Sequence, residues 1–243
     1  VIIISHNLQD VFKIADFINV LYLGTMVAAI PTAETTSDDV VGYITGSGDR
    51  VPEAIRQMGF GLEVISESEL ASGNLAKYDT IVVGIRAYQV RPDVVASNQR
   101  LLDYARNGGT LIVQYQLPGY AQQNLTPFPV QMGPRVADEN AAMKILAPDH
   151  PIFNFPNKIS DADFAGWVQE RNLYNFTNMP ADYTGLIESH DAGEPANNGG
   201  LVIAKLAKGN YVYCSYSMFR QLPAGVPGAY RLLANLLSLP KSK

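Results

Sequence analysis

Short apolar runs alternate with helix-like segments between residues 40 and 114. The longest segment between two runs, residues 93–107, has apolar positions at helical spacing and is predicted to be one helix. Runs that are apolar throughout and alternate with helices are typical of a parallel sheet covered by helices on both faces. The pattern therefore predicts an α/β domain, with strands at residues 40–44, 62–65, 80–85 and 110–114 and further helices at residues 51–58 and around Leu70.

The pattern changes after residue 117. Residues 117–180 are rich in Pro, Asn and Gly and show little periodicity, so we expect a long irregular insertion with short elements, such as residues 141–146. Regular structure returns with two strands, residues 201–206 and 211–216, whose short polar connection predicts a β-hairpin. A closing helix is predicted at residues 228–239, with inward positions Tyr230, Leu233, Leu236 and Leu237.

The first 39 residues have a pattern of their own, in which small and polar residues from 31 to 39 are typical of a linker. Because the sequence begins inside a predicted strand, we expect two units: a fragment or fused appendage at residues 1–39 and an α/β domain at residues 40–243. The elements predicted in the first unit are a strand at residues 1–5, a helix at residues 8–15 and a hairpin of residues 17–23 and 25–30.

Composition narrows the classes of function. A hydrophobic content of 47% with 17% charged residues is that of an ordinary globular protein. The formal net charge is -5 and no long basic run is present, which argues against nucleic acid and anionic membrane surfaces as partners. Every apolar run is far shorter than the roughly 20 residues that a membrane span needs. Cys214 is the single cysteine, which excludes a disulfide within the chain and a cysteine-based metal site.

The opening segment has a histidine directly after its predicted strand. Residues 1–6, Val-Ile-Ile-Ile-Ser-His, together with residues 8–16 and 18–24, resemble the switch-histidine region of the ATPase subunits of sugar-importing ABC transporters. The resemblance implies a nucleotide-switch role for His6, a cytoplasmic location, and transporter subunits as partners if the segment is functional. Phe17 stands where that family usually has arginine. The Gly-rich phosphate loop, the Walker B strand and the signature motif are missing, so we interpret the segment as an ATPase remnant that packs as an appendage.

Longer motifs lie after residue 40. One of them, residues 78–88, reads Tyr-Asp-Thr-Ile-Val-Val-Gly-Ile-Arg-Ala-Tyr, and the others span residues 46–59, 98–104, 108–115, 161–171 and 219–231. Together they resemble the glutamine-amidotransferase-like domain that follows PIG-L (LmbE-like) N-acetylglucosaminyl deacetylases. The resemblance implies a flavodoxin-like, class I amidotransferase-like fold and a deacetylase-type catalytic domain as partner. Residues 41–46 fit both families, so we hypothesise that the two sequences are joined there.

The zinc ligands that the deacetylase reaction needs are missing from this sequence. Those enzymes hold zinc in a His/Asp cluster of a separate domain, whereas His6, His150 and His190 lie far apart and have no second ligand at short spacing. His150 precedes Pro151 and is expected to cap a turn. We therefore expect neither a metal nor a cofactor.

An amidotransferase nucleophile is missing as well. That chemistry needs a cysteine on a strand-to-helix turn, activated by a histidine. The corresponding segments, residues 82–88 and 112–116, contain no cysteine, and no serine replaces it. Cys214 lies within a predicted strand and is expected to be a buried apolar group.

Several polar side chains follow the predicted strands, and ligands of open parallel sheets bind at the carboxyl ends of the strands. Arginine, tyrosine and glutamine side chains suit sugar hydroxyls or a carboxylate. The alternative interpretation is that these groups hold the long insertion over the sheet. The candidate ligand-binding residues are Ser47, Asp49, Arg86, Tyr88, Gln114, Tyr115 and Gln116.

Charged residues surround Trp167, the single tryptophan: Asp161, Asp163, Glu170 and Arg171. Paired carboxylates beside an aromatic ring are also found in glycosidases. We interpret them as helix-face charges around a packing tryptophan, and we expect pairing of these acids with Arg220 and Arg231.

The function predicted from the sequence is a non-catalytic, amidotransferase-like accessory domain. It would recognise a carbohydrate or act as a scaffold for a PIG-L type deacetylase. Two alternatives stay open. One is a remnant of a sugar ABC transporter subunit, supported by residues 1–30 alone, and the other is a carbohydrate-active enzyme of the trehalose-utilisation-like type.

Overall fold

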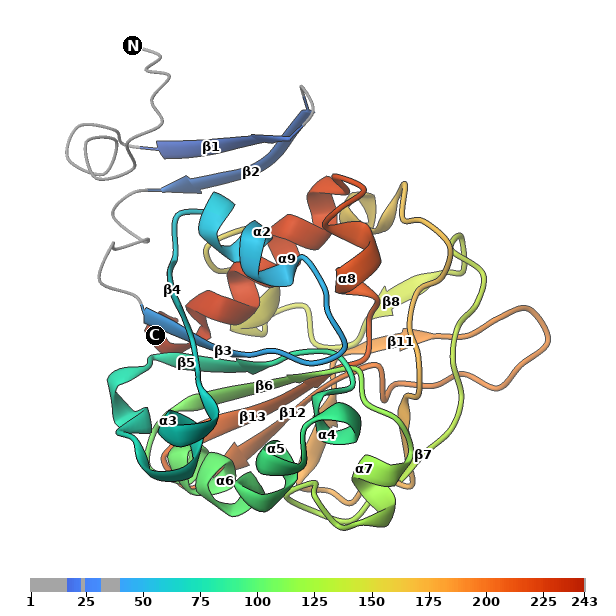
Figure 1. Ribbon diagram of the computed structural model, residues 1–243. Helices are drawn as coiled ribbons and strands as arrows, with labels where there is room; N and C mark the ends of the chain where they lie inside the picture. The colour runs from blue at the N-terminus through green and yellow to red at the C-terminus, as the bar shows by residue number, and fades with distance from the viewer. Residues whose placement is uncertain (1–16, 23–24, 32–39, 243) are drawn as a thin grey trace.

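A seven-stranded sheet lies at the centre of the computed structural model, which describes residues 17–22, 25–31 and 40–242 (Figure 1). Its strands are β3 (Val40–Ile44), β4 (Gly61–Val64), β5 (Thr80–Val83), β6 (Thr110–Gln114), β10 (Tyr183–Gly185), β12 (Leu201–Leu206) and β13 (Gly209–Cys214). They follow the order β10-β12-β13-β6-β5-β3-β4. The pairs from β4 to β13 are parallel, and β12 and β10 extend the sheet with antiparallel pairs. The predicted parallel sheet is thus confirmed, with a mixed edge.

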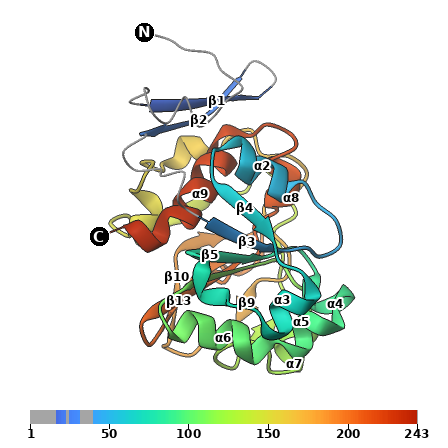
Figure 2. The same cartoon turned by 60° about the vertical axis from the view of Figure 1, so that its left-hand side comes forward.

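Alternating apolar residues give the sheet two buried faces. The helices are α2 (Val51–Gln57), α3 (Glu67–Ser72), α4 (Ala87–Val90), α5 (Pro92–Ala96), α6 (Asn98–Arg106), α7 (Gly119–Gln122), α8 (Met218–Gln221) and α9 (Pro227–Ser238). Val82 and Ile112 belong to one core with α2 and α9, whereas Ile81 and Leu111 belong to the other with α6. Figure 2 shows the two helix layers, with α2, α8 and α9 on one side and α3 to α7 on the other. The α/β architecture with helices on both faces is confirmed.

The prediction of a single helix at residues 93–107 is wrong in one respect, because the segment forms two helices. α5 ends at Ala96 and α6 begins at Asn98, with Ser97 between them at φ -94° and ψ 5°. The buried amide of Asn98 accepts a hydrogen bond from the Tyr88 hydroxyl at 2.6 Å and donates one to the Leu125 carbonyl at 3.0 Å. These bonds fix the start of α6 against α4 and the loop after α7, which periodicity alone does not reveal.

The predicted C-terminal hairpin is formed by β12 and β13, and β13 lies beside β6. Val212 is opposite Ile112 in the parallel pair. Gly209 makes this approach possible, because a Cβ at this position would lie 2.2 Å from the carbonyl oxygens of Ala105 and Gly109. The segment after β13 therefore reaches the same edge of the sheet as the segments after β5 and β6.

Residues 117–180 form the expected irregular insertion. The element predicted at residues 141–146 is a short strand there. The pieces of the insertion besides α7 are β7 (Gln131–Met132), β8 (Met143–Ile145), the 3-10 helices η2 (Pro151–Phe153) and η3 (Asp161–Phe164), and β9 (Phe176–Thr177). β8 pairs with β11 (Ile187–Ser189), and β7 pairs with β9. The insertion is thus tied together by short strand pairs.

The closing helix α9 anchors part of the insertion through a buried amide. The Oδ1 atom of Asn235 accepts a hydrogen bond from the Asn157 backbone N–H at 2.9 Å. Its Nδ2 atom donates to the carbonyl oxygens of Ile152 at 2.8 Å and Asn157 at 2.7 Å. One side chain of α9 thereby fixes the backbone on both sides of residue 155.

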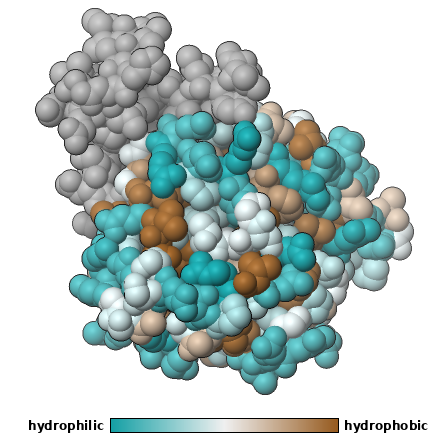
Figure 3. All heavy atoms as spheres, in the orientation of Figure 1, coloured by the Kyte–Doolittle hydropathy of each residue, from teal (hydrophilic) through white to brown (hydrophobic). Residues whose placement is uncertain are grey.

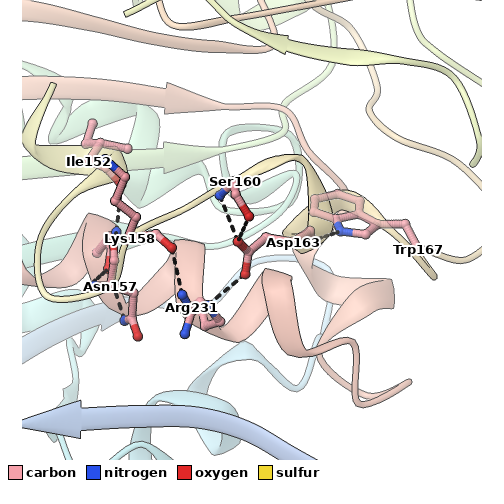
Figure 4. Close-up of polar contacts among 8 residues, drawn as sticks. Ile152, Asn157, Lys158, Ser160, Asp163, Trp167 and Arg231 are labelled. Atoms are coloured by element: carbon pink, nitrogen blue, oxygen red, sulfur yellow. Dashed lines mark hydrogen bonds and ion pairs between the residues drawn. The ribbon is translucent and has the colours of Figure 1, made fainter. Parts of the chain in front are cut away.

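An arginine one turn earlier in α9 makes a second anchor (Figure 4). Arg231 donates through Nε to Asp163 Oδ1 at 2.7 Å and through Nη2 to the Lys158 carbonyl at 2.7 Å. The Asp163 carbonyl in turn accepts a hydrogen bond from Trp167 Nε1 at 3.1 Å. The expected pairing of Arg231 with an acid near Trp167 is confirmed, and the tryptophan is buried as a packing residue.

The hairpin predicted in the first unit is confirmed as β1 (Phe17–Tyr22) and β2 (Thr25–Pro31), with β2 beside α9. The strand predicted at residues 1–5, the helix at residues 8–15, His6 and residues 32–39 lie outside the described residues. None of the helices in the described part of the chain has the length and hydropathy that crossing a bilayer requires.

The Asn235 anchor predicts a specific loss of stability. Asn235→Leu should lower the free energy of unfolding by about 2–4 kcal/mol, because buried backbone groups at residues 152 and 157 lose their partners. Urea unfolding followed by circular dichroism measures the change. Arg106→Ala is the matched control, since its ion pair with Asp103 is exposed and the expected change is below about 0.5 kcal/mol. Equal losses in the two variants would contradict the anchor.

Candidate functional site

The carboxyl ends of β3, β5, β6 and β13 meet at one edge of the sheet, because these strands are parallel. Ligands of open α/β sheets bind at this edge. The structure brings all seven predicted site residues to it, but it gives them different surroundings. Four of them are bound to other groups inside the protein: Asp49, Tyr88, Gln114 and Gln116.

Asp49 and Gln114 belong to an internal hydrogen-bond chain. The buried Tyr43 hydroxyl accepts a hydrogen bond from Gln114 Nε2 at 3.0 Å and donates to Asp49, whose oxygens lie at 2.9 and 3.0 Å. Asp49 Oδ1 also accepts from the Val51 N–H at 2.9 Å, at the start of α2. Burial raises the pKa of Asp49, and these hydrogen bonds oppose the rise. The carboxylate therefore stabilises the loop after β3. Ser47 remains exposed beside it.

Gln116 and Tyr88 stabilise the turn that follows β5 through hydrogen bonds. The buried Gln116 side chain accepts from the Tyr88 backbone N–H at 3.1 Å and donates to the carbonyl oxygens of Gly84 at 3.0 Å and Gln114 at 2.9 Å. The Tyr88 hydroxyl is bound to Asn98, and burial raises the pKa of this phenol. Both side chains thus connect protein segments to each other.

Arg86 lies at the apex of the turn between β5 and α4. Its φ of 55° and ψ of 19° are left-handed, a conformation that costs a non-glycine residue about 1–2 kcal/mol. Gly46 allows the turn to pack tightly, because a Cβ there would lie 2.0 Å from the Ile85 carbonyl oxygen. The predicted strand at residues 80–85 ends at Val83, because the chain turns at Ile85 and Arg86, where the Ala87 N–H donates to the Gly84 carbonyl at 3.3 Å.

The Arg86 side chain is partly exposed. Nε donates to Gln89 Oε1 at 2.8 Å, and the two terminal nitrogens have no acceptor among the described residues. Sharp strand-to-helix turns with a strained apex residue hold the nucleophile in α/β hydrolases. In this protein the apex carries a guanidinium group, whose chemistry is to bind acceptors and anions.

Aromatic rings pack next to Arg86. The Tyr115 ring stacks on Tyr174, at 6.0 Å between centroids, and on Phe219, at 5.8 Å. Together with Ile85 and Leu173 they form a small apolar cluster, which Phe219 connects to the core around α9. Tyr115 is 8% exposed, whereas Tyr174 and Phe219 are partly exposed. The rings therefore offer an apolar surface at the ligand edge of the sheet.

A second arginine packs on one of these rings. Arg220 Nε binds Glu170 Oε1 at 2.6 Å, and its guanidinium lies 4.9 Å from the Phe219 ring centroid. This confirms the expected pairing of Arg220 with an acid. Burial raises the pKa of Tyr115, while the positive charges of Arg86 and Arg220 oppose the rise. We call this group the edge cluster; it consists of Arg86, Tyr115, Glu170, Tyr174, Phe219 and Arg220.

Left-handed backbone conformations occur in and next to the edge cluster, and among the described residues Asn124, Asn178 and Ala207 have a positive φ as well. Besides Arg86, Tyr174 has a φ of 56° and Gln169, next to Glu170, has a φ of 66°. Strained conformations of non-glycine residues cluster at active sites and ligand-binding segments, and they persist where the surrounding structure holds them. The Tyr213 hydroxyl, which donates to the Tyr174 carbonyl at 2.8 Å, is one such restraint.

The sequence did not identify Glu170, Tyr174, Phe219 and Arg220 as site residues. They lie in the insertion and after the hairpin, and they reach the edge because β13 pairs in parallel with β6. The sequence predicts the strand itself, but its parallel pairing with β6 is a long-range contact that the hairpin pattern does not reveal.

Other candidate groups have structural roles. His150 Nδ1 accepts from the Ile152 N–H at 3.2 Å, which confirms the predicted turn cap. His190 Nδ1 contacts the Asp191 carbonyl at 2.9 Å. Cys214 is 1% exposed, and burial raises its pKa to about 12. No group of three metal-binding side chains occurs within the described ranges.

A hollow of about 570 Å³ lies at the opposite edge, beside Tyr78 and Tyr104 at the amino ends of β5 and β6. Its arginine, Arg100, already donates to the carbonyl oxygens of Leu70 and Gly73. A second hollow, about 370 Å³, lies beside β10. We place the candidate site at the edge cluster, because its charged groups have free donors and because ligands of parallel sheets bind at that edge.

Comparison with known proteins gives the fold but no family. No protein-family model matches the chain, and no curated protein matches it. Among solved structures, a ThuA-like protein from Bacteroides uniformis is similar over 84% of this chain and 92% of its own, with a TM-score of 0.55 and 13% identity. For a cytoplasmic protein from Salmonella typhimurium LT2 the coverages are 82% and 98%, the TM-score 0.53 and the identity 15%.

A glutamine amidotransferase from Thermotoga maritima is similar over 82% of this chain and 98% of its own, with a TM-score of 0.51 and 9% identity. Identities this low show the fold alone. The flavodoxin-like, class I glutamine-amidotransferase-like fold expected from the sequence is therefore confirmed.

Proposed function

We propose that this amidotransferase-like domain is a non-catalytic carbohydrate-recognition module whose site is the edge cluster. The observation that carries the proposal is a group of stacked rings near two arginines. The partly exposed rings of Tyr174 and Phe219 both stack on Tyr115, and Arg220 packs on Phe219. Sugar rings have C–H faces that pack on aromatic rings and hydroxyl groups that accept hydrogen bonds from guanidinium groups. An aromatic ring beside convergent polar groups serves both requirements.

The absence of an amidotransferase nucleophile at the apex turn supports recognition over catalysis. Arg86 occupies the apex, and the thiol of Cys214 is buried within β13 with a raised pKa. A thiol with a pKa near 12 is protonated at neutral pH, and the thiolate is the nucleophilic form. Glu170, the acid of the edge cluster, is paired with Arg220 at 2.6 Å.

The resemblance to PIG-L type proteins supports a deacetylase-type catalytic domain as the partner of this module. The module would hold one part of an N-acetylated sugar while the catalytic domain acts on another. A scaffold without a ligand would be expected to present a continuous apolar surface to its partner. The face in Figure 3 instead shows separate apolar patches among polar side chains. The large hydrophobic side chains most exposed among the described residues are Val64 at 47% and Val90 at 46%.

A carbohydrate-active enzyme of the trehalose-utilisation-like type is the second candidate. The similarity of fold to a ThuA-like protein favours it over the ABC-transporter alternative. It predicts conversion of a bound sugar, whereas a recognition module releases the sugar unchanged. Analysis of the sugar after incubation with the protein separates the two.

The buried thiol gives a direct test of the missing nucleophile. Because Cys214 is the single cysteine, the reaction of the folded protein with Ellman's reagent reports on this residue alone. We expect no release of thionitrobenzoate in buffer at pH 8 and one equivalent in 6 M guanidinium chloride. Rapid reaction of the folded protein, together with ammonia release from glutamine, would contradict a recognition module.

Carbohydrate binding is tested with a panel of neutral, N-acetylated and acidic sugars in a thermal-shift assay. A sugar at a hundred times its dissociation constant should stabilise the protein by about 2.7 kcal/mol, which shifts the midpoint by a few degrees. Phe219→Ala should weaken binding at least about tenfold, because a stacking surface is lost.

The matched control is Phe128→Ala, which removes a partly buried ring packed on Tyr183, away from the edge cluster. It should retain the affinity of the wild type. A panel without any shift, or equal losses in the two variants, would overturn the proposed function.

A further inference from the structure

Positive charge exceeds negative charge in the edge cluster. The charges of two arginines, Arg86 and Arg220, act on the Tyr115 phenol, and Glu170 is the acid that acts on it. Glu170 is bound to Arg220, which leaves the charge of Arg86 without a carboxylate partner among the described residues. The whole chain has a formal net charge of -5, so this positive site is local and not a property of the surface as a whole.

The free donors of the cluster come from neighbouring strand ends. The terminal nitrogens of Arg86 have no acceptor in the described part of the chain, and the same holds for the Tyr115 hydroxyl. The two residues are fixed to each other, because the Arg86 N–H donates to the Tyr115 carbonyl at 3.0 Å. A guanidinium fork and a phenol hydroxyl at neighbouring strand ends are suited to a carboxylate or phosphate group, which accepts several hydrogen bonds at once.

The left-handed backbone conformation of Arg86 also costs free energy. Glycine would occupy its left-handed conformation without strain, so the arginine is not there for the turn. Its Nε is oriented by Gln89, which limits the directions that the guanidinium fork can take. A strained, oriented and unpaired guanidinium is what an anion-binding residue requires.

We propose, resting on the proposed function, that the sugar bound by the edge cluster carries an anionic group and that Arg86 binds this group. Arg220 adds positive potential and stays paired with Glu170. The rings of Tyr174 and Phe219 contact the sugar ring. The ligand class is therefore an acidic sugar, such as a uronic acid or a sugar phosphate, and not a neutral sugar.

Titration calorimetry with matched sugars tests the inference. The probes are D-glucuronate, D-galacturonate and D-glucose 6-phosphate, each against its neutral parent, D-glucose or D-galactose. We expect an acid to bind at least about tenfold more tightly than its parent, because a hydrogen bond to a charged group contributes more than a neutral one. The advantage should shrink between 50 mM and 500 mM NaCl. Preference for a uronate over the phosphate, or the reverse, identifies the anionic group.

Three variants connect the preference to Arg86. Arg86→Gln should reduce acid binding to the level of the neutral parent, and Arg86→Lys, which keeps the charge but loses the fork, should fall in between. Arg106→Gln is the control, since it removes an exposed arginine of α6 that is paired with Asp103. Thermal unfolding of each variant shows that the fold is kept.

The outcomes separate the inference from the proposed function. If neutral parents bind as tightly as their acids and Phe219→Ala weakens both, the recognition module stands and the anionic ligand is wrong. If acids bind preferentially but Arg86→Gln has no effect, Arg86 is not the anion-binding residue. If no sugar of either kind binds, the proposed function and the inference both fail.

Discussion

The buried amide of Gln116 joins the ends of β5 and β6, and the geometry of the candidate site depends on it. It accepts a hydrogen bond from the Tyr88 N–H and donates to the carbonyl oxygens of Gly84 and Gln114, so one side chain connects both strand ends to the start of α4. Buried polar groups without partners cost about 1–3 kcal/mol each, so the hydrogen bonds of this amide favour the sharp turn between β5 and α4. Arg86 lies at the apex of that turn and is held in its left-handed conformation by the surrounding bonds.

The proposed recognition role uses the edge of an amidotransferase-like fold at which a nucleophile could stand. The turn that could hold a nucleophile is present, but an arginine stands at its apex, and rings from β6, the insertion and the segment after β13 cover the surface beside it. The insertion is firmly attached through Asn235 and Arg231 of α9, so Tyr174 and Glu170 belong to an anchored segment and not to a free loop. Recognition by preorganised side chains loses little conformational entropy on binding.

Much of the fold follows from the sequence pattern, whereas the site follows only in part. Continuous apolar strands and amphipathic helices have a strong signal, and the strands at residues 40–44 and 110–114 have the predicted bounds. The pattern does not show which polar side chains turn inward: Gln114 and Gln116 bind internal groups, although their positions predicted a ligand contact. Glu170 and Arg220 become site residues through the parallel pairing of β13 with β6, a long-range contact that local periodicity does not encode.

The central claim is that Arg86 is kept in a strained conformation for binding and not for stability. Urea unfolding of Arg86→Gly tests it directly, with Ala207→Gly as the control, because Ala207 has a φ of 49° in the turn between β12 and β13, at the opposite edge. Relief of left-handed strain should raise the free energy of unfolding by up to about 1 kcal/mol in both variants. Only Arg86→Gly should lose sugar binding. A clear loss of stability in Arg86→Gly, with binding retained, would show that the arginine serves the fold and would contradict the account.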